Sequence, residues 1–188
     1  MDKLKNTTAY LAGPVESSKD PNNWRKEAST KLKTLNITPW DPLIKPRWVP
    51  QIDGKAQAKM KEDIPKYQET NKMLRKFCLH LAANATFIIV KIDKTFTVGT
   101  FEEIAIAKYK PVFVISEDIP SMWLVDQLDA YDNLEFVFHK SIDSLMDLLK
   151  KINRGEVHPQ PLVKWPSLTY DDSDYVGMVP FKTPIVHR

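Results

Sequence analysis

Short continuous apolar runs recur along the chain and are separated by segments with helical spacing. The runs at residues 7–13, 86–92, 111–115 and 134–138 are rich in β-branched and aromatic residues, and residues 36–42 add a short run that breaks at Pro42. The unbroken Ile and Val residues of 86–92 are typical of a strand buried on both faces of a sheet. These five segments are predicted to be strands.

The segments between the strands place apolar residues on one helical face. Trp24, Ala28 and Leu32 form such a stripe, and Leu74, Cys78, Leu81 and Ala85 form another. We expect helices that begin at Asp20–Pro21, at Thr70, at Phe101, near residue 120, and after Ser141, the last one ending at Gly155.

The alternation of strands and helices predicts an α/β protein with a parallel sheet covered on both faces. Right-handed crossovers make such a sheet doubly wound. Residues 43–66 have poor periodicity and several prolines, so we expect a long loop with at most a short helix there. Residues 93–100 are expected to be the loop before the helix at Phe101.

Composition narrows the class of protein. The 188 residues suffice for one domain, and 43% apolar with 27% charged residues is ordinary for a globular protein. The net charge of +3 is too small to indicate nucleic-acid binding. A single cysteine and no long apolar run predict a cytoplasmic protein without disulfides or membrane spans. No metal or cofactor is expected.

Residues 156–188 differ from the rest and are treated as a C-terminal arm following a domain of residues 1–155. They contain five prolines together with Trp165, Tyr170, Tyr175 and Phe181. A disordered tail rarely carries so many aromatic residues. Two interpretations stay open: a strap on the surface of its own domain, or an arm that packs on a neighbouring subunit.

Candidate chemistry gathers where two predicted strands end. Ligands of parallel α/β sheets bind at the C-terminal ends of the strands. Gly13 and Gly99 follow two of these strands and would let a ligand approach the backbone. Glu102 and Glu103 follow Gly99 in the first turn of the expected helix, where the helix dipole favours an anionic carboxylate. Such a carboxylate suits a nucleophile, although glutamates at helix starts are often merely solvated, and the spacing does not say which one points inward.

Four stretches, YLAGPVE, WRKEA, WDP and GTFEEIAIAKYKPVFVI, resemble the nucleoside 2-deoxyribosyltransferase-like superfamily, in order over residues 8–152. The short members often carried by bacteriophages are the most similar, which would place the protein in a host cytoplasm. The superfamily also includes hydrolases of nucleoside 5′-monophosphates. All its enzymes cleave or exchange an N-glycosidic bond.

The resemblance implies a flavodoxin-like sheet of five parallel strands in the order 2-1-3-4-5 and a homodimer or larger homo-oligomer. It also implies a glutamate nucleophile four residues after a glycine. Counting from Gly99 gives Glu103, with Tyr10 holding it through the phenol hydroxyl and Glu102 as a neighbour. Attack at C1′ would give a covalent glycosyl-enzyme, which water or a second nucleobase resolves.

The resemblance further implies substrate contacts. Gly13 and Pro14 would shape the sugar pocket, and Trp24 and Asp41 lie where the nucleobase pocket is built, although we favour Trp24 as a core residue. Gly99 and Thr100 would border the substrate at the helix start.

Thr97 stands where the transferases carry an aspartate and the monophosphate hydrolases a serine. A hydroxyl can donate to a phosphate, which favours a nucleotide substrate. Thr97 also fits as a helix cap, and the two roles can coexist.

Two positions depart from the pattern. Cys78 and Thr86 stand where the superfamily usually has acids, and the first of these acids is thought to assist proton transfer at the leaving base. Asp63, Glu69 or a residue of a partner subunit are candidates to replace it. If nothing replaces it, the alternative function is a nucleotide-binding protein without catalytic activity. Cys78 also fits as a small buried apolar residue.

Overall fold

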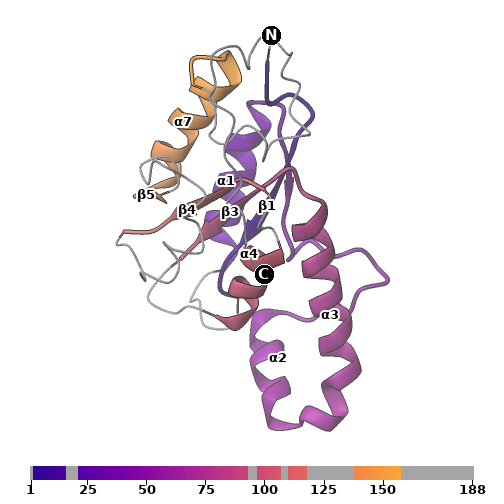
Figure 1. Cartoon of the computed structure of the whole chain (residues 1–188). Helices are drawn as coiled ribbons and strands as arrows, with labels where there is room; N and C mark the ends of the chain where they lie inside the picture. The colour runs from indigo at the N-terminus through magenta and orange to yellow at the C-terminus, as the bar shows by residue number, and fades with distance from the viewer. Residues whose placement is uncertain (1, 16–20, 93–96, 107–109, 118–137, 158–188) are drawn as a thin grey trace, which may run out of the picture.

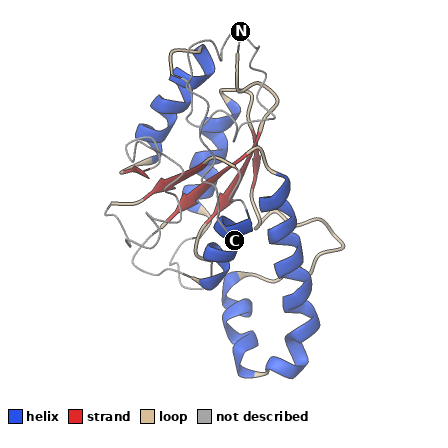
Figure 2. Cartoon of the chain, in the orientation of Figure 1, coloured by secondary structure: helices blue, strands red, loops and turns tan. Residues whose placement is uncertain are grey.

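The computed structural model describes residues 2–15, 21–92, 97–106, 110–117 and 138–157. Its centre is a five-stranded parallel sheet in the order β2-β1-β3-β4-β5. The strands are β1 (Thr8–Ala12), β2 (Thr38–Trp40), β3 (Phe87–Lys91), β4 (Val112–Ile115) and β5 (Phe138–His139). Figures 1 and 2 show the sheet between its helices, so the predicted flavodoxin-like, doubly wound fold and its strand order are confirmed.

Alternate residues of the strands enter two separate apolar cores. Ala9 and Leu11 of β1 pack in the core beneath α1 (Asn23–Lys33) and α7 (Ile142–Arg154). Tyr10 and Ala12 face the opposite core, which α3 (Ile64–Asn84) and α4 (Val98–Ile106) cover. The period of two in β1 therefore decides which side chains meet α4.

The start and end of α7 agree with the sequence. Ser141 accepts a hydrogen bond from the Ser144 amide in a capping box, and Gly155 ends the helix in the left-handed conformation with φ of 73°. A left-handed terminal residue favours glycine because it has no Cβ. The apolar stripe of this helix packs in the first core.

Residues 43–66 contain the short helix that was allowed for, but the loop is shorter than predicted because a long helix begins before residue 66. The chain forms α2 (Gly54–Lys59), the short 3₁₀ helix η1 (Met60–Glu62) and then α3, which begins at Ile64 rather than at Thr70. Asp63 caps α3 by accepting from the Lys66 amide, and Pro65 lies in the first turn. Figure 1 shows α2 and this part of α3 as a hairpin projecting from the sheet, so no apolar stripe marked its start.

Two other helix starts also differ from the expectation. α1 begins at Asn23, two residues after Pro21. α4 begins at Val98 rather than Phe101, so Gly99 and Thr100 are helical and Glu103 lies in the second turn. The Thr97 carbonyl accepts the amides of Thr100 and Phe101, which fixes this earlier start.

Several expected features fall outside the described residues. These are the Asp20 cap, the helix at 120–131, residues 134–137 of the fifth strand, and the arm from residue 158 onward. Within the described part of the chain, no helix is long and apolar enough to cross a bilayer.

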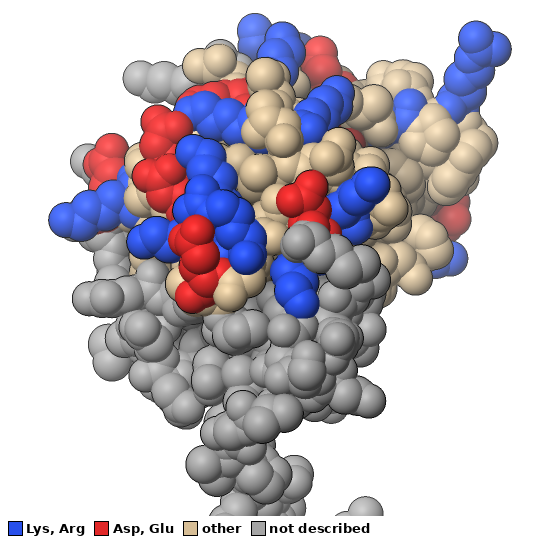
Figure 3. All heavy atoms as spheres, turned by 90° about the horizontal axis from the view of Figure 1, so that it is seen from above, with Lys and Arg blue, Asp and Glu red and all other residues tan. Residues whose placement is uncertain are grey.

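The face of the molecule seen in Figure 3 carries charges of both signs close together. Lysine and arginine side chains alternate there with aspartate and glutamate rather than forming one basic surface. This mixture matches the small net charge of the chain.

Candidate functional site

A phenol and a carboxyl meet on the face of the sheet that α4 covers. The Tyr10 hydroxyl donates to Glu103 Oε1 at 2.7 Å. Tyr10 is fully buried in the middle of β1, which is flanked by β2 and β3 in the sheet. Glu103 belongs to α4. Burial, followed by the nearby Glu103 carboxylate, raises the pKa of Tyr10, so its hydroxyl remains a donor at neutral pH.

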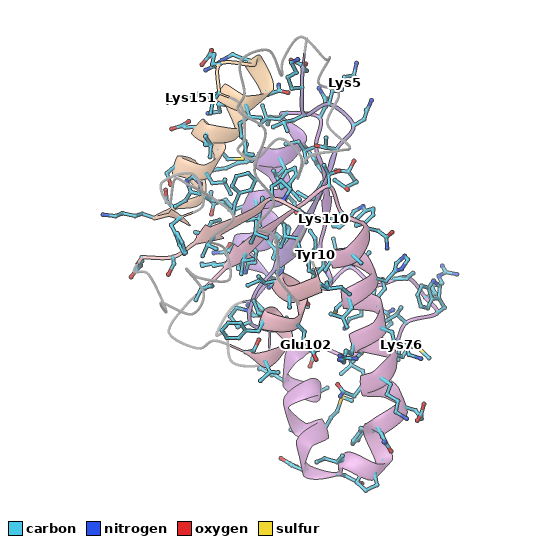
Figure 4. The ribbon with its side chains drawn as sticks, viewed as in Figure 1. Lys5, Tyr10, Lys76, Glu102, Lys110 and Lys151 are labelled. Carbon is cyan, nitrogen blue, oxygen red and sulfur yellow. The ribbon has the colours of Figure 1, made fainter. Side chains whose placement is uncertain are left out.

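The neighbouring glutamate points elsewhere. Glu102 accepts from Nε and Nη2 of Arg75 at 2.8 Å each, which joins α4 to α3. Both side chains of this pair are well exposed, and Figure 4 shows Glu102 on the α3 side of α4. The spacing left the inward glutamate undecided, and these contacts place Glu103 toward the sheet and Glu102 toward Arg75.

The ionisation of Glu103 differs from the expectation. Burial raises the pKa of Glu103 to about 7, against the opposing hydrogen bond from Tyr10 and the charge of Arg25. The helix dipole was expected to favour the anion, but Glu103 lies beyond the first turn, where that effect fades. Loss of hydration outweighs it, so Glu103 keeps its proton to a higher pH than a free glutamate does.

Cys78 of α3 completes the contacts of the phenol. Burial, followed by the charge of the nearby Glu103 carboxylate, raises the pKa of Cys78 to about 11. The thiol and the Tyr10 hydroxyl therefore both stay protonated at neutral pH.

Arg25 is a buried cation that the sequence analysis missed. Its guanidinium donates to the carbonyls of Leu11 (3.2 Å), Pro21 (2.6 Å) and Gly13 (2.8 Å). The side chain is 0% exposed and lies 4.7 Å from the ring centroid of Trp24. A signal was available, because Arg25 shares the i, i+3, i+7 face of Ala28 and Leu32, and a charge on a buried stripe is unusual.

The backbone at Gly13 and the packing of Trp24 explain why these residue types occur at the two positions. Gly13 has φ of 154°, and a Cβ there would lie 2.9 Å from the Lys91 carbonyl oxygen and 3.2 Å from the Trp24 ring. Trp24 is 7% exposed and packs in the core beneath α1, which agrees with the favoured core role. Pro14 follows Gly13 and is buried at the same strand end.

Asp41 is the carboxylate that pairs with Arg25. Its Oδ1 lies 3.7 Å from Arg25 Nε and accepts the Leu43 amide at 2.9 Å. Asp41 is 9% exposed, and no other carboxylate is as buried within the described ranges. It lies after β2, next to β1 in the sheet, so the same edge holds Asp41 and the Gly13 turn.

The start of α4 holds the remaining predicted residues. Thr97 Oγ1 and Thr100 Oγ1 lie 3.0 Å apart, and Thr100 is buried. Gly99 is exposed, and a Cβ there would meet no atom within 4 Å. The fold therefore requires a glycine at position 13 but not at position 99.

The positions that depart from the superfamily pattern have separate explanations. Thr86 lies at the N-terminal end of β3, where its hydroxyl and amide exchange hydrogen bonds with Thr8. Thr86 thus precedes by two residues Ile88, the β3 partner of Tyr10. Asp63 caps α3, and Glu69 pairs with Lys72 on an exposed face, so neither replaces the acid at Cys78.

No cluster of three or more potential metal ligands occurs in the part of the chain that the structure describes. No protein-family model matches this chain. No curated protein matches it in sequence either.

Proposed function

We propose that the protein cleaves or exchanges the N-glycosidic bond of a deoxynucleoside or its 5′-monophosphate through Glu103. The observation that carries this proposal is the hydrogen bond between Tyr10 and Glu103, which fixes a partly buried carboxyl against the sheet. A nucleophile needs such fixation because its oxygen must reach C1′ along one direction. The resemblance of residues 8–152 to the 2-deoxyribosyltransferase-like superfamily supplies the substrate class.

The reaction takes place in two displacements. Glu103 Oε attacks C1′, the C1′–N bond breaks, and its electron pair leaves with the base, which takes up a proton from solvent at nitrogen. Water, or a nitrogen of a second base, then attacks C1′ and gives up a proton to solvent, and the bond to Glu103 breaks to release its carboxylate. Both transition states resemble an oxocarbenium ion, which a nearby carboxylate stabilises.

The raised pKa of Glu103 gives this scheme a particular pH dependence. Only the ionised carboxylate can attack C1′, so activity would rise as pH increases through about 7. Tyr10 would stabilise the anion by donating to it and would keep the second oxygen free for attack.

Thr97 favours a nucleotide as substrate. Its hydroxyl lies next to that of Thr100 at the first residues of α4. Two hydroxyls and the N-terminal end of a helix are compatible with a 5′-phosphate, whereas the aspartate of the transferases would repel one.

A second candidate is a nucleotide-binding protein without catalytic activity, and Cys78 is the observation that favours it. A thiol with a pKa of about 11 is a poor proton donor to a departing base. Asp63 and Glu69, the suggested replacements, are engaged elsewhere, Asp63 as the cap of α3 and Glu69 in an exposed ion pair with Lys72.

One experiment separates the two candidates. The purified full chain is incubated with each deoxynucleoside and deoxynucleoside 5′-monophosphate, with and without a second free base, and released or exchanged base is quantified by chromatography. Glu103→Gln is the inactive control, and Glu102→Gln the matched control on the adjacent residue. Thermal shift with the same ligands runs in parallel.

Base release that requires Glu103 supports the enzyme. Nucleotide-dependent stabilisation without base release supports the binding protein. Neither release nor stabilisation with any of the ligands contradicts both.

A further inference from the structure

Positive charge is concentrated in one part of the chain. Residues 43–79, which form the loop after β2, then α2, η1 and most of α3, carry nine lysines and arginines against four aspartates and glutamates. Their net charge is therefore +5, although that of the whole chain is only +3, so the remaining residues together are negative. The projecting hairpin of α2 and α3 lies within this segment, so an acidic partner would be attracted to the hairpin.

Apolar side chains of the same segment are exposed. Trp48 is 68% exposed and contacts Phe77 of α3 edge to face, with the ring centroids 5.9 Å apart. Met73 is 42% exposed and lies four residues before Phe77, so the two side chains are neighbours on α3. Large exposed apolar side chains that lie together are typical of a surface that binds another molecule.

Two exposed lysines share this side of α3. Lys66 is seven residues before Met73 and Lys76 is three residues after it, and both spacings place side chains on one face of a helix. Glu69 lies near them but pairs with Lys72, so this face keeps a net positive charge. We call the set of exposed side chains on this side the hairpin surface, and it consists of Trp48, Lys66, Met73 and Lys76.

The C-terminal arm has the complementary composition. Residues 165–181, which lie outside the described part of the chain, contain three aspartates and no lysine or arginine. The aspartates are Asp171, Asp172 and Asp174, and the aromatic residues of the same segment are Trp165, Tyr170, Tyr175 and Phe181. Carboxylates among aromatic side chains match a surface of exposed lysines around a tryptophan, both in charge and in apolar area.

The place where the arm begins favours the hairpin of a second copy. The Lys3 amide donates to the Asn153 carbonyl, so the end of α7 lies beside the residues that lead into β1. α3 ends just before β3, and its 21 residues carry its start about 30 Å from that end. Figure 1 shows the end of α7 and the hairpin at opposite ends of the molecule. An arm that reached its own hairpin would have to run along the whole molecule, whereas a neighbouring copy can present its hairpin directly.

We propose that residues 165–181 of one copy dock on the hairpin surface of a second copy. The aspartates of the arm pair with Lys66 and Lys76, and its aromatic residues cover Trp48 and Met73. This contact joins the copies into a homo-oligomer. It involves neither Tyr10 nor Glu103, so it goes beyond the proposed function and does not depend on it.

An exchange of charges tests the contact in the full chain. One variant reverses the hairpin surface by Lys66→Glu with Lys76→Glu. A second variant reverses the arm by Asp171→Lys, Asp172→Lys and Asp174→Lys, and a third carries both sets. The control, Lys26→Glu with Lys33→Glu, changes the same charge at exposed positions of α1, which covers the opposite face of the sheet. Analytical ultracentrifugation at low salt measures the dissociation constant of the oligomer for each protein.

Each reversal alone should weaken association about tenfold or more, because like charges then face one another. The variant with both sets should recover to within about threefold of the parent, since the opposite charges meet again, and the control should associate like the parent. A monomeric parent chain overturns the inference. A combined variant that associates no better than the two single reversals also overturns it.

Cross-linking identifies which copy supplies the arm. A carbodiimide joins carboxylates to amines in an equal mixture of nitrogen-15-labelled and unlabelled full chains whose subunit exchange is confirmed by mass. Mixed pairs that join the arm aspartates to Lys66 or Lys76 support the inference. Pairs found within single chains alone overturn it, because the arm then lies on its own domain. Binding of a thymidine oligonucleotide that requires these two lysines, without such cross-links, overturns it in favour of a nucleic acid.

Discussion

Arg75 holds Glu102 by two hydrogen bonds of 2.8 Å each, whereas the next residue along α4, Glu103, contacts Tyr10. Adjacent positions on a helix are about 100° apart, so one glutamate can join α4 to α3 while the other enters the core side. The pair of acids is thus divided between an exposed contact with Arg75 and a partly buried contact with Tyr10.

This division predicts different effects of substitution on the two glutamates. Glu103→Gln should reduce base release by roughly a thousandfold or more, as removal of a covalent nucleophile usually does. Glu102→Gln should lose less than about tenfold, because an exposed ion pair contributes little. Steady-state rates with a common deoxynucleotide test this, and equal losses in the two variants would refute the assignment.

The titration of Glu103 predicts how stability depends on pH. The folded-state pKa of about 7 lies above the value of 4.5 for a free glutamate, so the folded state binds the extra proton between these limits. The stability that this proton provides is complete below about pH 4.5 and is lost as pH rises through 7.

Glu103→Gln removes that dependence, because an amide does not titrate. The variant should exceed the parent in free energy of unfolding by about 1 to 3 kcal/mol at pH 8, and by much less at pH 4. Denaturant unfolding at a series of pH values measures the difference. A constant difference across the series would mean that Glu103 titrates normally.

The two glycines should respond oppositely to alanine. Gly13→Ala places a Cβ 2.9 Å from the Lys91 carbonyl oxygen at φ of 154°, which should destabilise the fold by about 1 to 3 kcal/mol or more. Gly99→Ala adds a methyl group in open space within α4 and should stabilise it by up to about 1 kcal/mol. Thermal unfolding of both variants decides the matter, and a tolerated Gly13→Ala would contradict this geometry.

Thr97 gives a prediction about phosphate. Thr97→Asp introduces a charge at the start of α4 and should weaken binding of a deoxynucleoside 5′-monophosphate far more than binding of the nucleoside. Thr97→Asn, similar in size but neutral, is the matched control. Calorimetry with both ligands measures the preference, and an unchanged preference in Thr97→Asp would leave Thr97 as the residue that starts the helix.

The C-terminal arm gives a prediction about assembly. We expect a homo-oligomer to which residues 156–188 contribute, because their aromatic residues are of the kind enriched at interfaces. Light scattering gives the mass of each particle, which divided by the mass of one chain gives the number of chains. That number should be larger for the full chain than for a chain ending at Gly155. A monomeric full chain contradicts the prediction, and an oligomer unchanged by truncation excludes the arm from it.

The sheet was predictable because its strands have the continuous apolar pattern that burial on both faces requires, and α7 was predictable because its stripe and caps agree. The start of α3 was not predictable, because its first turns project from the sheet and carry no apolar stripe. Local turn chemistry at Asp63 and Pro65 was the available signal there.

The site was only partly predictable. The resemblance paired Tyr10 with Glu103, and the structure places them in contact. The pKa of Glu103 depends on burial by α3, α4 and β1 together, which spacing along one helix cannot express. The contacts of Arg25 depend on carbonyls from two other segments, and these are invisible in a pattern of side chains.

Tyr10 and Glu103 are 93 residues apart in the chain, and this separation has a consequence for biosynthesis. At about 5 to 20 residues per second, a ribosome would add Tyr10 to the chain roughly 5 to 20 s before Glu103. The contact also has a high sequence separation, so its loop-closure cost makes it a late event in folding. A nascent or prematurely terminated chain that ends before α4 therefore contains Tyr10 and Arg25 but lacks the carboxyl of Glu103.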